Sequence, residues 1–93
     1  MTYKLIFLEP ALKEWNKLDG TIRNQFKKKL AERLQNPHVV SAMLRGRDNR
    51  YKIKLRDVGY RLVYEVIEDR LVVRVVAVGK RERNQIYNVA NSR

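Results

Sequence analysis

Basic side chains recur at every second position in one stretch of this 93-residue chain. Lys52 and Lys54 alternate with apolar residues between Tyr51 and Leu55, and Arg61 follows after a turn. Alternation with a period of two predicts a β-strand, so the two lysines project from one face of a sheet, roughly 7 Å apart. Arg61 joins them if the register of the predicted hairpin permits. A rigid sheet that presents three cations on one face is suited to binding a polyanion.

Cations in this arrangement could support the cleavage of a phosphodiester. Attack by an adjacent 2′-hydroxyl needs in-line geometry, a proton acceptor and stabilisation of negative charge in the transition state. Arginine guanidinium groups suit the last task. A lysine with a pKa of about 10.4 is a poor base at neutral pH, but crowding among Lys52, Lys54, Arg61 and Arg81 disfavours its charged form. We therefore hypothesise that one lysine of this cluster is a base, in which case the cleavage rate rises with pH.

The remaining residue types argue against the common catalytic arrangements. The chain has no cysteine, which excludes disulfides and thiolate metal sites. His38 is the one histidine, so a pair of histidines within one chain is excluded, and we interpret His38 as a surface residue of a loop. The carboxylates are few and scattered, and there is no glycine-rich phosphate loop. We therefore expect no metal and no cofactor.

The overall charge also indicates an anionic partner. Lysine and arginine number 21 against 10 aspartates and glutamates, which gives a net charge of +11. Such an excess opposes compaction by self-repulsion, so nucleic acid, an acidic protein partner or both explain it better than solubility alone. No apolar run approaches the roughly 20 residues of a membrane helix. Without cysteines or a visible signal peptide, we expect a cytoplasmic protein and no membrane partner.

The elements that must position the cations follow from periodicity and from turn residues. In the first half of the chain we predict a strand over Tyr3–Leu8, a helix from Pro10 that ends at Asp19-Gly20, and a helix from a Thr21 cap to Asn36-Pro37. In the second half we predict the hairpin over Tyr51–Tyr64, a buried central strand over Leu71–Val78 and a short helix containing Ile86 and Tyr87. Residues 1–93 are therefore expected to form one α+β domain. Its sheet has about four strands, mostly antiparallel, with an N-terminal helical hairpin and a short C-terminal helix.

Further cations lie close to the predicted hairpin. Lys27, Lys28 and Lys29 form either a solvated helix face or contacts to an RNA backbone. The arginines at positions 45, 47 and 50 are each typical of solvated side chains, but together they extend a positive strip. Arg74 interrupts the central strand and is expected to reach a sheet edge or the cationic face. Trp15 belongs to an apolar helical stripe, which favours core packing over base stacking.

Six fragments of the chain together resemble the RelE family of toxins from bacterial type II toxin–antitoxin modules, and the resemblance covers nearly the whole chain. The fragments are Ala11-Leu12-Lys13-Glu14-Trp15, Lys27-Lys28-Lys29-Leu30, Leu44-Arg45-Gly46, Tyr51-Lys52-Ile53-Lys54-Leu55-Arg56, Gly59-Tyr60-Arg61-Leu62-Val63-Tyr64 and Val78-Gly79-Lys80-Arg81-Glu82-Arg83. Each alone is weak, whereas their order and spacing are specific.

The resemblance implies a metal-independent endoribonuclease that cuts mRNA in the A site of the 70S ribosome and inhibits translation. It implies Lys52 and Lys54 as phosphate ligands, with Lys54 a candidate general base. Arg61 and Arg81 would stabilise the scissile phosphate, and Arg81 is a candidate general acid. Tyr87 would stack on or orient the nucleotide, and a role as the base is the alternative. The expected supporting RNA contacts are Arg45, Arg83, Lys27, Lys28 and Lys29.

The resemblance also implies partners, and two alternatives stay open. A cognate antitoxin would neutralise the toxin, and the complex would repress its own operon, so that operator DNA is bound only through the complex. The first alternative is a gyrase poison of the related ParE type, which lacks the Lys-Ile-Lys and Arg81 constellation. The second is a non-enzymatic RNA-binding or ribosome-binding module, whose Arg81→Ala variant would lose affinity and not cleavage.

Overall fold

A computed structural model describes residues 2–46, 49–80 and 85–93. The helices and strands are, in chain order, β1 (Lys4–Phe7), α1 (Glu9–Asn16), α2 (Gly20–Gln35), the short 3-10 helix η1 (Val40–Ala42), β2 (Arg50–Leu55), β3 (Tyr60–Ile67), the 3-10 helix η2 (Glu68–Arg70), β4 (Val72–Lys80) and α3 (Gln85–Asn91). None of the helices formed by these described residues combines the length and the apolar character that crossing a bilayer requires.

The four strands form one sheet in the order β1-β4-β3-β2. Strands β2, β3 and β4 are antiparallel neighbours, and β1 pairs with β4 in parallel. The α+β fold and the mostly antiparallel sheet are therefore confirmed. Strand β4 is central, as its apolar sequence predicted, and Val75, Val76 and Ala77 are fully buried.

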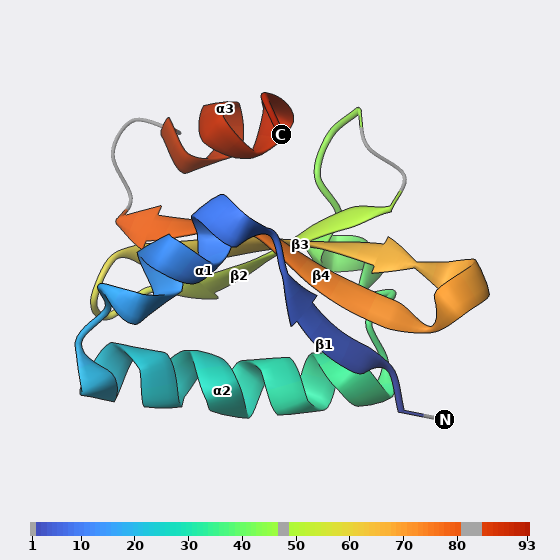
Figure 1. Ribbon diagram of the computed structural model, residues 1–93, viewed down its shortest axis with the longest axis horizontal. Coiled ribbons are helices and arrows are strands. Elements are labelled where there is room, and N and C mark those ends of the chain that lie inside the picture. The colour runs from blue at the N-terminus through green and yellow to red at the C-terminus, as the bar shows by residue number, and fades with distance from the viewer. Residues whose placement is uncertain (1, 47–48, 81–84) are drawn as a thin grey trace.

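The helices cover the sheet unequally. Helix α2 runs along one side of the sheet, α3 lies on the other, and α1 lies beside the part of β4 that extends past β1 (Figure 1). The first side forms the larger core, in which Phe26 is fully buried and Trp15 is 8% exposed. The second side forms a smaller core around Val63, Val76 and Ile86. Because α3 is short, part of this second side stays open.

Two element boundaries differ from the sequence prediction. Gly20 is the first residue of α2 and does not end α1, and Asp19 takes the N-cap position that was expected for Thr21. The reason is a turn of only three residues between the helices, in which the backbone N–H of Arg23 already bonds to the Asp19 carbonyl at 3.0 Å. Leu71 has a left-handed backbone with φ of 53°, so β4 begins one residue later than predicted.

A hydrogen-bonded cluster joins segments that are distant in sequence. The Tyr3 hydroxyl donates to Glu68 Oε1 at 2.7 Å, and His38 Nε2 lies 2.7 Å from Glu68 Oε2. On its other side, His38 Nδ1 lies 3.0 Å from the Tyr51 hydroxyl. The bond from Tyr3, and then the bond to His38, hold the pKa of the Glu68 carboxyl below its usual value. The cluster therefore links the N-terminal strand, the residues after α2, and the sheet.

The shifted pKa of Glu68 predicts a pH dependence of stability. A carboxyl whose pKa is lower in the folded chain stabilises the fold above its unfolded pKa, and that contribution is lost as the pH falls through the folded pKa. We expect Glu68→Gln to lower Tm at neutral pH and to reduce the further fall in Tm between about pH 5 and pH 3, measured by circular dichroism. Asp69→Asn is the matched control at the neighbouring exposed acid. Equal falls in Tm for Glu68→Gln and wild type over this interval would contradict the prediction.

Candidate functional site

The antiparallel register brings the predicted cations together on one face of the sheet. Lys54 lies directly opposite Arg61, and Lys52 lies two residues earlier on β2, opposite Val63. The expectation that Arg61 joins the two lysines is therefore confirmed. Like charges directly opposite each other destabilise a strand pair, so a bound anion would relieve an electrostatic cost at this position.

A pocket of about 280 Å³ joins three of the predicted site residues from separate segments. Arg45 comes from the loop before β2, Lys52 from β2 and Tyr87 from α3, and Leu44 and Asn91 complete the lining. Tyr87 is half-buried, and Arg45 is exposed. The pocket therefore combines two basic groups with an aromatic ring, a combination suited to a phosphate and its adjoining base.

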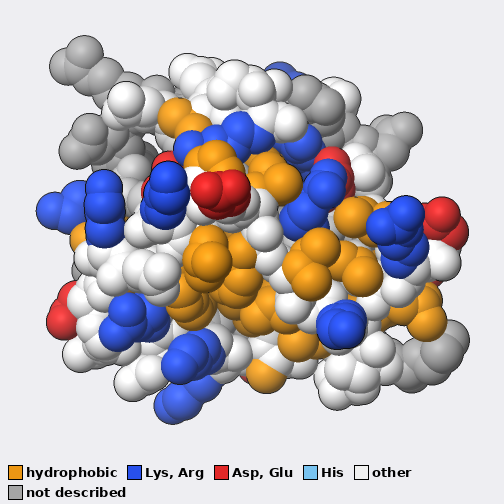
Figure 2. Space-filling view, viewed as in Figure 1, with side chains coloured by type: hydrophobic (Ala, Val, Ile, Leu, Met, Phe, Trp, Pro, Cys, Tyr) orange, Lys and Arg blue, Asp and Glu red, His pale blue; other side chains and the backbone are white. Residues whose placement is uncertain are grey.

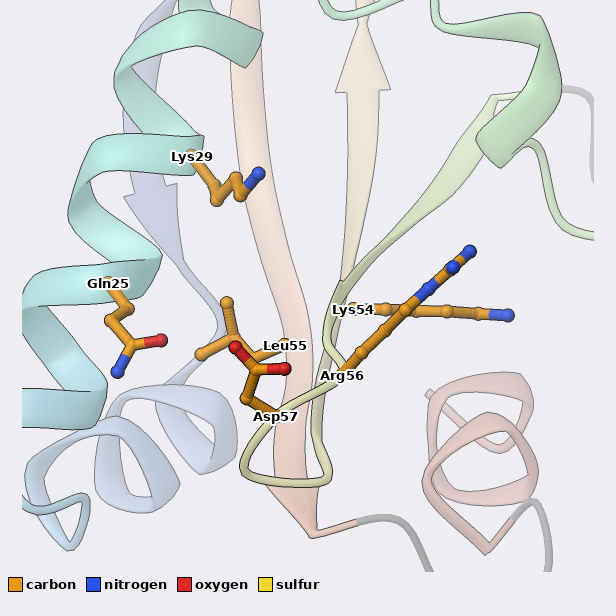
Figure 3. Close-up of a pocket in the computed structure, with 6 residues that line it drawn as sticks. All are labelled: Gln25, Lys29, Lys54, Leu55, Arg56 and Asp57. Carbon is orange, nitrogen blue, oxygen red and sulfur yellow. The ribbon is translucent and has the colours of Figure 1, made fainter.

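A second pocket of about 290 Å³ lies at the hairpin turn, lined by Lys54, Arg56, Gly59 and Arg61. Gly59 has a φ of +69°, a left-handed conformation that glycine adopts readily and that suits it to the turn. Arg56 was not in the sequence-based set of site residues. It has the same strand parity as Lys52 and Lys54, so the alternation itself could have identified it. Lys54 and Arg56 point away from α2, toward the side of the sheet on which α3 lies (Figure 3).

The ion pairs within residues 2–46, 49–80 and 85–93 leave much of this cationic surface uncompensated. They join His38 to Glu68, Arg50 and Arg74 to Glu65, and Arg93 to Glu14. Within the same residues, Lys52, Arg56 and Arg61 thus keep their charge without a carboxylate partner. Nor does this part of the chain place three or more histidine, cysteine, aspartate or glutamate side chains where they could hold a metal ion.

The remaining predicted contacts are placed differently. Lys27, Lys28 and Lys29 are exposed on α2, on the other side of the sheet. Of these three, Lys29 lines a pocket that reaches Lys54 and Arg56 (Figure 3). Arg81 and Arg83 lie outside the described residues, as does Arg47.

Arg50 corrects one expectation, because it is not a solvated arginine. Its residue exposure is 4%, and its Nε donates to Glu65 Oε2 at 3.2 Å. Glu65 also pairs with Arg74, which lies on the cationic side as expected but is neutralised there. Arg50 has the same strand parity as Lys52, but α3 covers it: its Nη1 donates to the Ala90 carbonyl at 2.6 Å.

Helix α3 has a second anchor at its C-terminal side. Arg93 donates to both carboxylate oxygens of Glu14, at 2.9 and 3.0 Å, and to the Val76 carbonyl at 2.9 Å. Glu14 in turn accepts a hydrogen bond from the backbone N–H of Val78 at 3.2 Å. Glu14 of α1 and Arg93 thus provide hydrogen-bond partners for backbone groups at the edge of β4, where the strand extends beyond β1. Arg50 and Arg93 thereby hold the helix that carries Tyr87.

Comparison with known proteins gives consistent results. Residues 5–85 match the family model described as ParE toxin of type II toxin-antitoxin system, parDE. The mRNA interferase toxin RelE of Escherichia coli (strain K12) is 55% identical over 93 residues, which is 100% of this chain and 98% of that protein. Two solved structures are similar. The R81A/R83A variant of E. coli toxin RelE in the free state has a TM-score of 0.91 and 52% identity, over 99% of this chain and 97% of that one. The toxin in the intact E. coli RelBE toxin–antitoxin complex has a TM-score of 0.83 and 57% identity, over 87% and 99%.

The two arginines that pair with Glu65 allow a matched test of the α3 anchor. We expect Arg50→Met to cost about 3 kcal/mol of unfolding free energy, because it breaks a buried pair, and to raise amide hydrogen exchange throughout α3. Arg74→Met is the control, since it removes an ion pair to the same carboxylate but no bond to α3. Urea denaturation and hydrogen exchange measure the two effects. Equal exchange of α3 amides in both variants would show that Arg50 is not the anchor.

Proposed function

The chain belongs to the RelE-like toxins, in the family of ParE toxins of type II toxin–antitoxin systems, and we propose that it is an endoribonuclease that cuts mRNA in the ribosomal A site. The observation that carries the proposal is the convergence of Lys52, Lys54 and Arg61 on one face of the sheet, beside a pocket that contains Tyr87. This set supplies charge for a phosphate and a ring for a base. Cleavage of mRNA in the A site would inhibit translation.

The proposed reaction uses the RNA itself as the nucleophile. The 2′-hydroxyl oxygen attacks the adjacent phosphorus, the bond to the 5′-oxygen breaks, and a 2′,3′-cyclic phosphate and a 5′-hydroxyl result. Lys54 in its neutral form would accept the proton of the 2′-hydroxyl, while Lys52 and Arg61 stabilise the extra negative charge on the phosphate oxygens. Tyr87 would stack on the nucleotide. The role of Arg81 as a second phosphate ligand and as the proton donor to the 5′-oxygen rests on the family resemblance.

We also propose that cleavage depends on the ribosome, and the lining of the two pockets supports this. Their lining contains neither a histidine nor a carboxylate, so the strong bases common in nucleases are missing from the described part of the site. In this proposal, the in-line geometry of the RNA strand is imposed from outside the protein. The A site would supply that geometry and the toxin the charge. This proposal places the protein in the cytoplasm and predicts negligible cleavage of free RNA.

A cognate antitoxin is the proposed protein partner, by analogy with the similar toxin of the E. coli RelBE toxin–antitoxin complex. Hydrophobic side chains gather across the middle of the face formed by β1 and α1, with lysines and arginines around them (Figure 2). Ile6 and Leu12 from these two elements are 37% and 42% exposed. An amphipathic, acidic antitoxin segment would fit this surface and the net charge of +11. The complex would then repress its own operon, with operator DNA contacted through the complex.

Two alternative functions would use this cationic surface differently. A ParE-like gyrase poison is favoured by the description of the matching family model, but it has no use for the cationic cluster. A non-enzymatic RNA-binding or ribosome-binding module would use the charges for affinity alone. Loss of cleavage without a comparable loss of binding therefore separates the proposed nuclease from both.

Primer extension on programmed ribosomes tests the proposal directly. We expect the wild type to cut within the A-site codon and Arg61→Ala to reduce the cleavage rate by about a hundredfold or more, since it removes a transition-state ligand. Ribosome binding should weaken much less, by about tenfold. Arg70→Ala, which removes an exposed arginine from η2, is the matched control and should cut normally.

The other outcomes of this assay are also informative. Ribosome binding without cleavage by the wild type would support the binding module, and inhibition of gyrase supercoiling would support the ParE-like function. Efficient cleavage of a free oligonucleotide at the same protein concentration would refute the dependence on the ribosome. Arg81→Ala, assayed in parallel, tests the role that the resemblance implies.

A further inference from the structure

We propose that the outer edge of strand β2 carries a second RNA-phosphate site, next to the pocket that contains Tyr87; this inference rests on the proposed function. The site is a pocket of about 270 Å³. Its lining residues are Arg33, Ser41, Ala42, Lys52, Lys54 and Arg56. Four of these six are basic, so the pocket is suited to a phosphodiester group.

Arg33 reaches this pocket from α2, and its contacts leave its charge unneutralised. Its Nη1 donates to the Lys52 carbonyl at 3.3 Å and to the Tyr64 hydroxyl at 2.9 Å. Burial raises the pKa of Tyr64 in spite of the opposing effect of Arg33, so the hydroxyl is neutral. The Tyr64 hydroxyl itself donates a hydrogen bond to the Pro37 carbonyl at 2.8 Å. Arg33 is therefore fixed by two neutral acceptors.

The bonds of Arg33 also leave donors available. Both described bonds use Nη1, whereas a guanidinium has five N–H donors. Within the described parts of the chain, Nη2 and Nε of Arg33 have no other hydrogen-bond partner. A guanidinium that is held by one nitrogen and free at the others presents a rigid fork, the geometry that binds a phosphate in two places.

The acidic residue near this edge, Asp57, lines a different pocket. The neighbouring pocket between α2 and the hairpin turn includes Asp57 together with Lys29 (Figure 3). The pocket of Arg33 has no carboxylate in its lining, and a concave surface lined by one sign of charge concentrates the field on a bound ion. This contrast favours the pocket of Arg33 as the anion site.

The new site is continuous with the proposed cleavage site. Lys52 lines both this pocket and the one with Tyr87, while Lys54 and Arg56 also line the one with Arg61. Strand β2 is the last strand of the sheet, and the described bridge on its outer side, Met43 to Tyr51, lies before Lys52. An RNA strand can therefore pass over this edge, so that the cleaved phosphate lies on one side and a phosphate further along lies against Arg33.

Ser41 gives a test that leaves the existing contacts intact. It is exposed on η1 and lines the pocket, and its side chain makes no hydrogen bond within the described parts of the chain. Ser41→Glu places a carboxylate among the cations, Ser41→Gln adds the same bulk without charge, and Ser41→Lys adds a cation. The probes are a three-nucleotide and a nine-nucleotide RNA, each with a 2′-deoxy group at the scissile position, and fluorescence anisotropy measures Kd.

We expect Ser41→Glu to weaken binding of the nine-nucleotide RNA about tenfold and to reduce its salt dependence by about 0.7 in log–log slope. Ser41→Gln should match wild type, and Ser41→Lys should bind more tightly. The trinucleotide should bind all variants alike, because it does not reach over the edge. A third result is that Ser41→Glu weakens binding to programmed ribosomes but leaves binding of the nine-nucleotide RNA unchanged. That result would support the same phosphate site, with ribosomal RNA as the source of the phosphate.

Equal binding of Ser41→Glu and Ser41→Gln to both the long RNA and ribosomes would overturn the proposal. So would an effect confined to an acidic antitoxin peptide, which would make the pocket a protein-docking site. These measurements need no cleavage. Failure of the proposed nuclease activity, seen in primer extension, is therefore distinguishable from failure of the phosphate site.

Discussion

The side chains of strand β2 must alternate between a covered and an uncovered face of the sheet, and the site depends on that constraint. Tyr51, Ile53 and Leu55 are buried under α2, so the residues between them project to the other side. A shift of one residue in register would place the lysines in the core and the apolar side chains in water, which makes the register strongly determined. The same burial that stabilises the fold thereby fixes where the cations point.

Tyr87 has a different origin, because local structure alone does not place it. Helix α3 has seven residues, fewer than a helix needs to be stable by itself in water. Its position comes from Ile86 and Ala90 in the smaller core and from the bonds of Arg50 and Arg93. The proposed site thus combines a rigid part, built on the sheet, with a part whose geometry depends on a few tertiary contacts.

This difference explains how far the sequence alone could predict the molecule. Local periodicity predicted the strands, the two N-terminal helices, the core position of Trp15 and the shared face of Lys52 and Lys54. The burial of Arg50 could not be predicted, because it depends on a helix 40 positions further along the chain. The partners of His38 come from separate segments and are invisible in its sequence neighbourhood for the same reason.

Other differences have more local causes. The boundary at Gly20 was missed because a glycine after a helix and a glycine at the start of the next helix look alike in sequence. Arg56 could have been predicted as a site residue, because it continues the alternation of Lys52 and Lys54 along the strand. The positions of Arg81 and Arg83 remain predictions.

The parallel pairing of β1 with β4 has a consequence for how the protein is made. Strand β1 is synthesised before its partner β4, which becomes available only after the helices and the hairpin have been translated. Closing so long a loop is slow compared with forming the local β2-β3-β4 meander. The nascent chain therefore carries an unpaired strand and an incomplete core until β4 has been translated. In the proposed function, the toxin therefore lacks its complete fold for as long as β4 is still being synthesised.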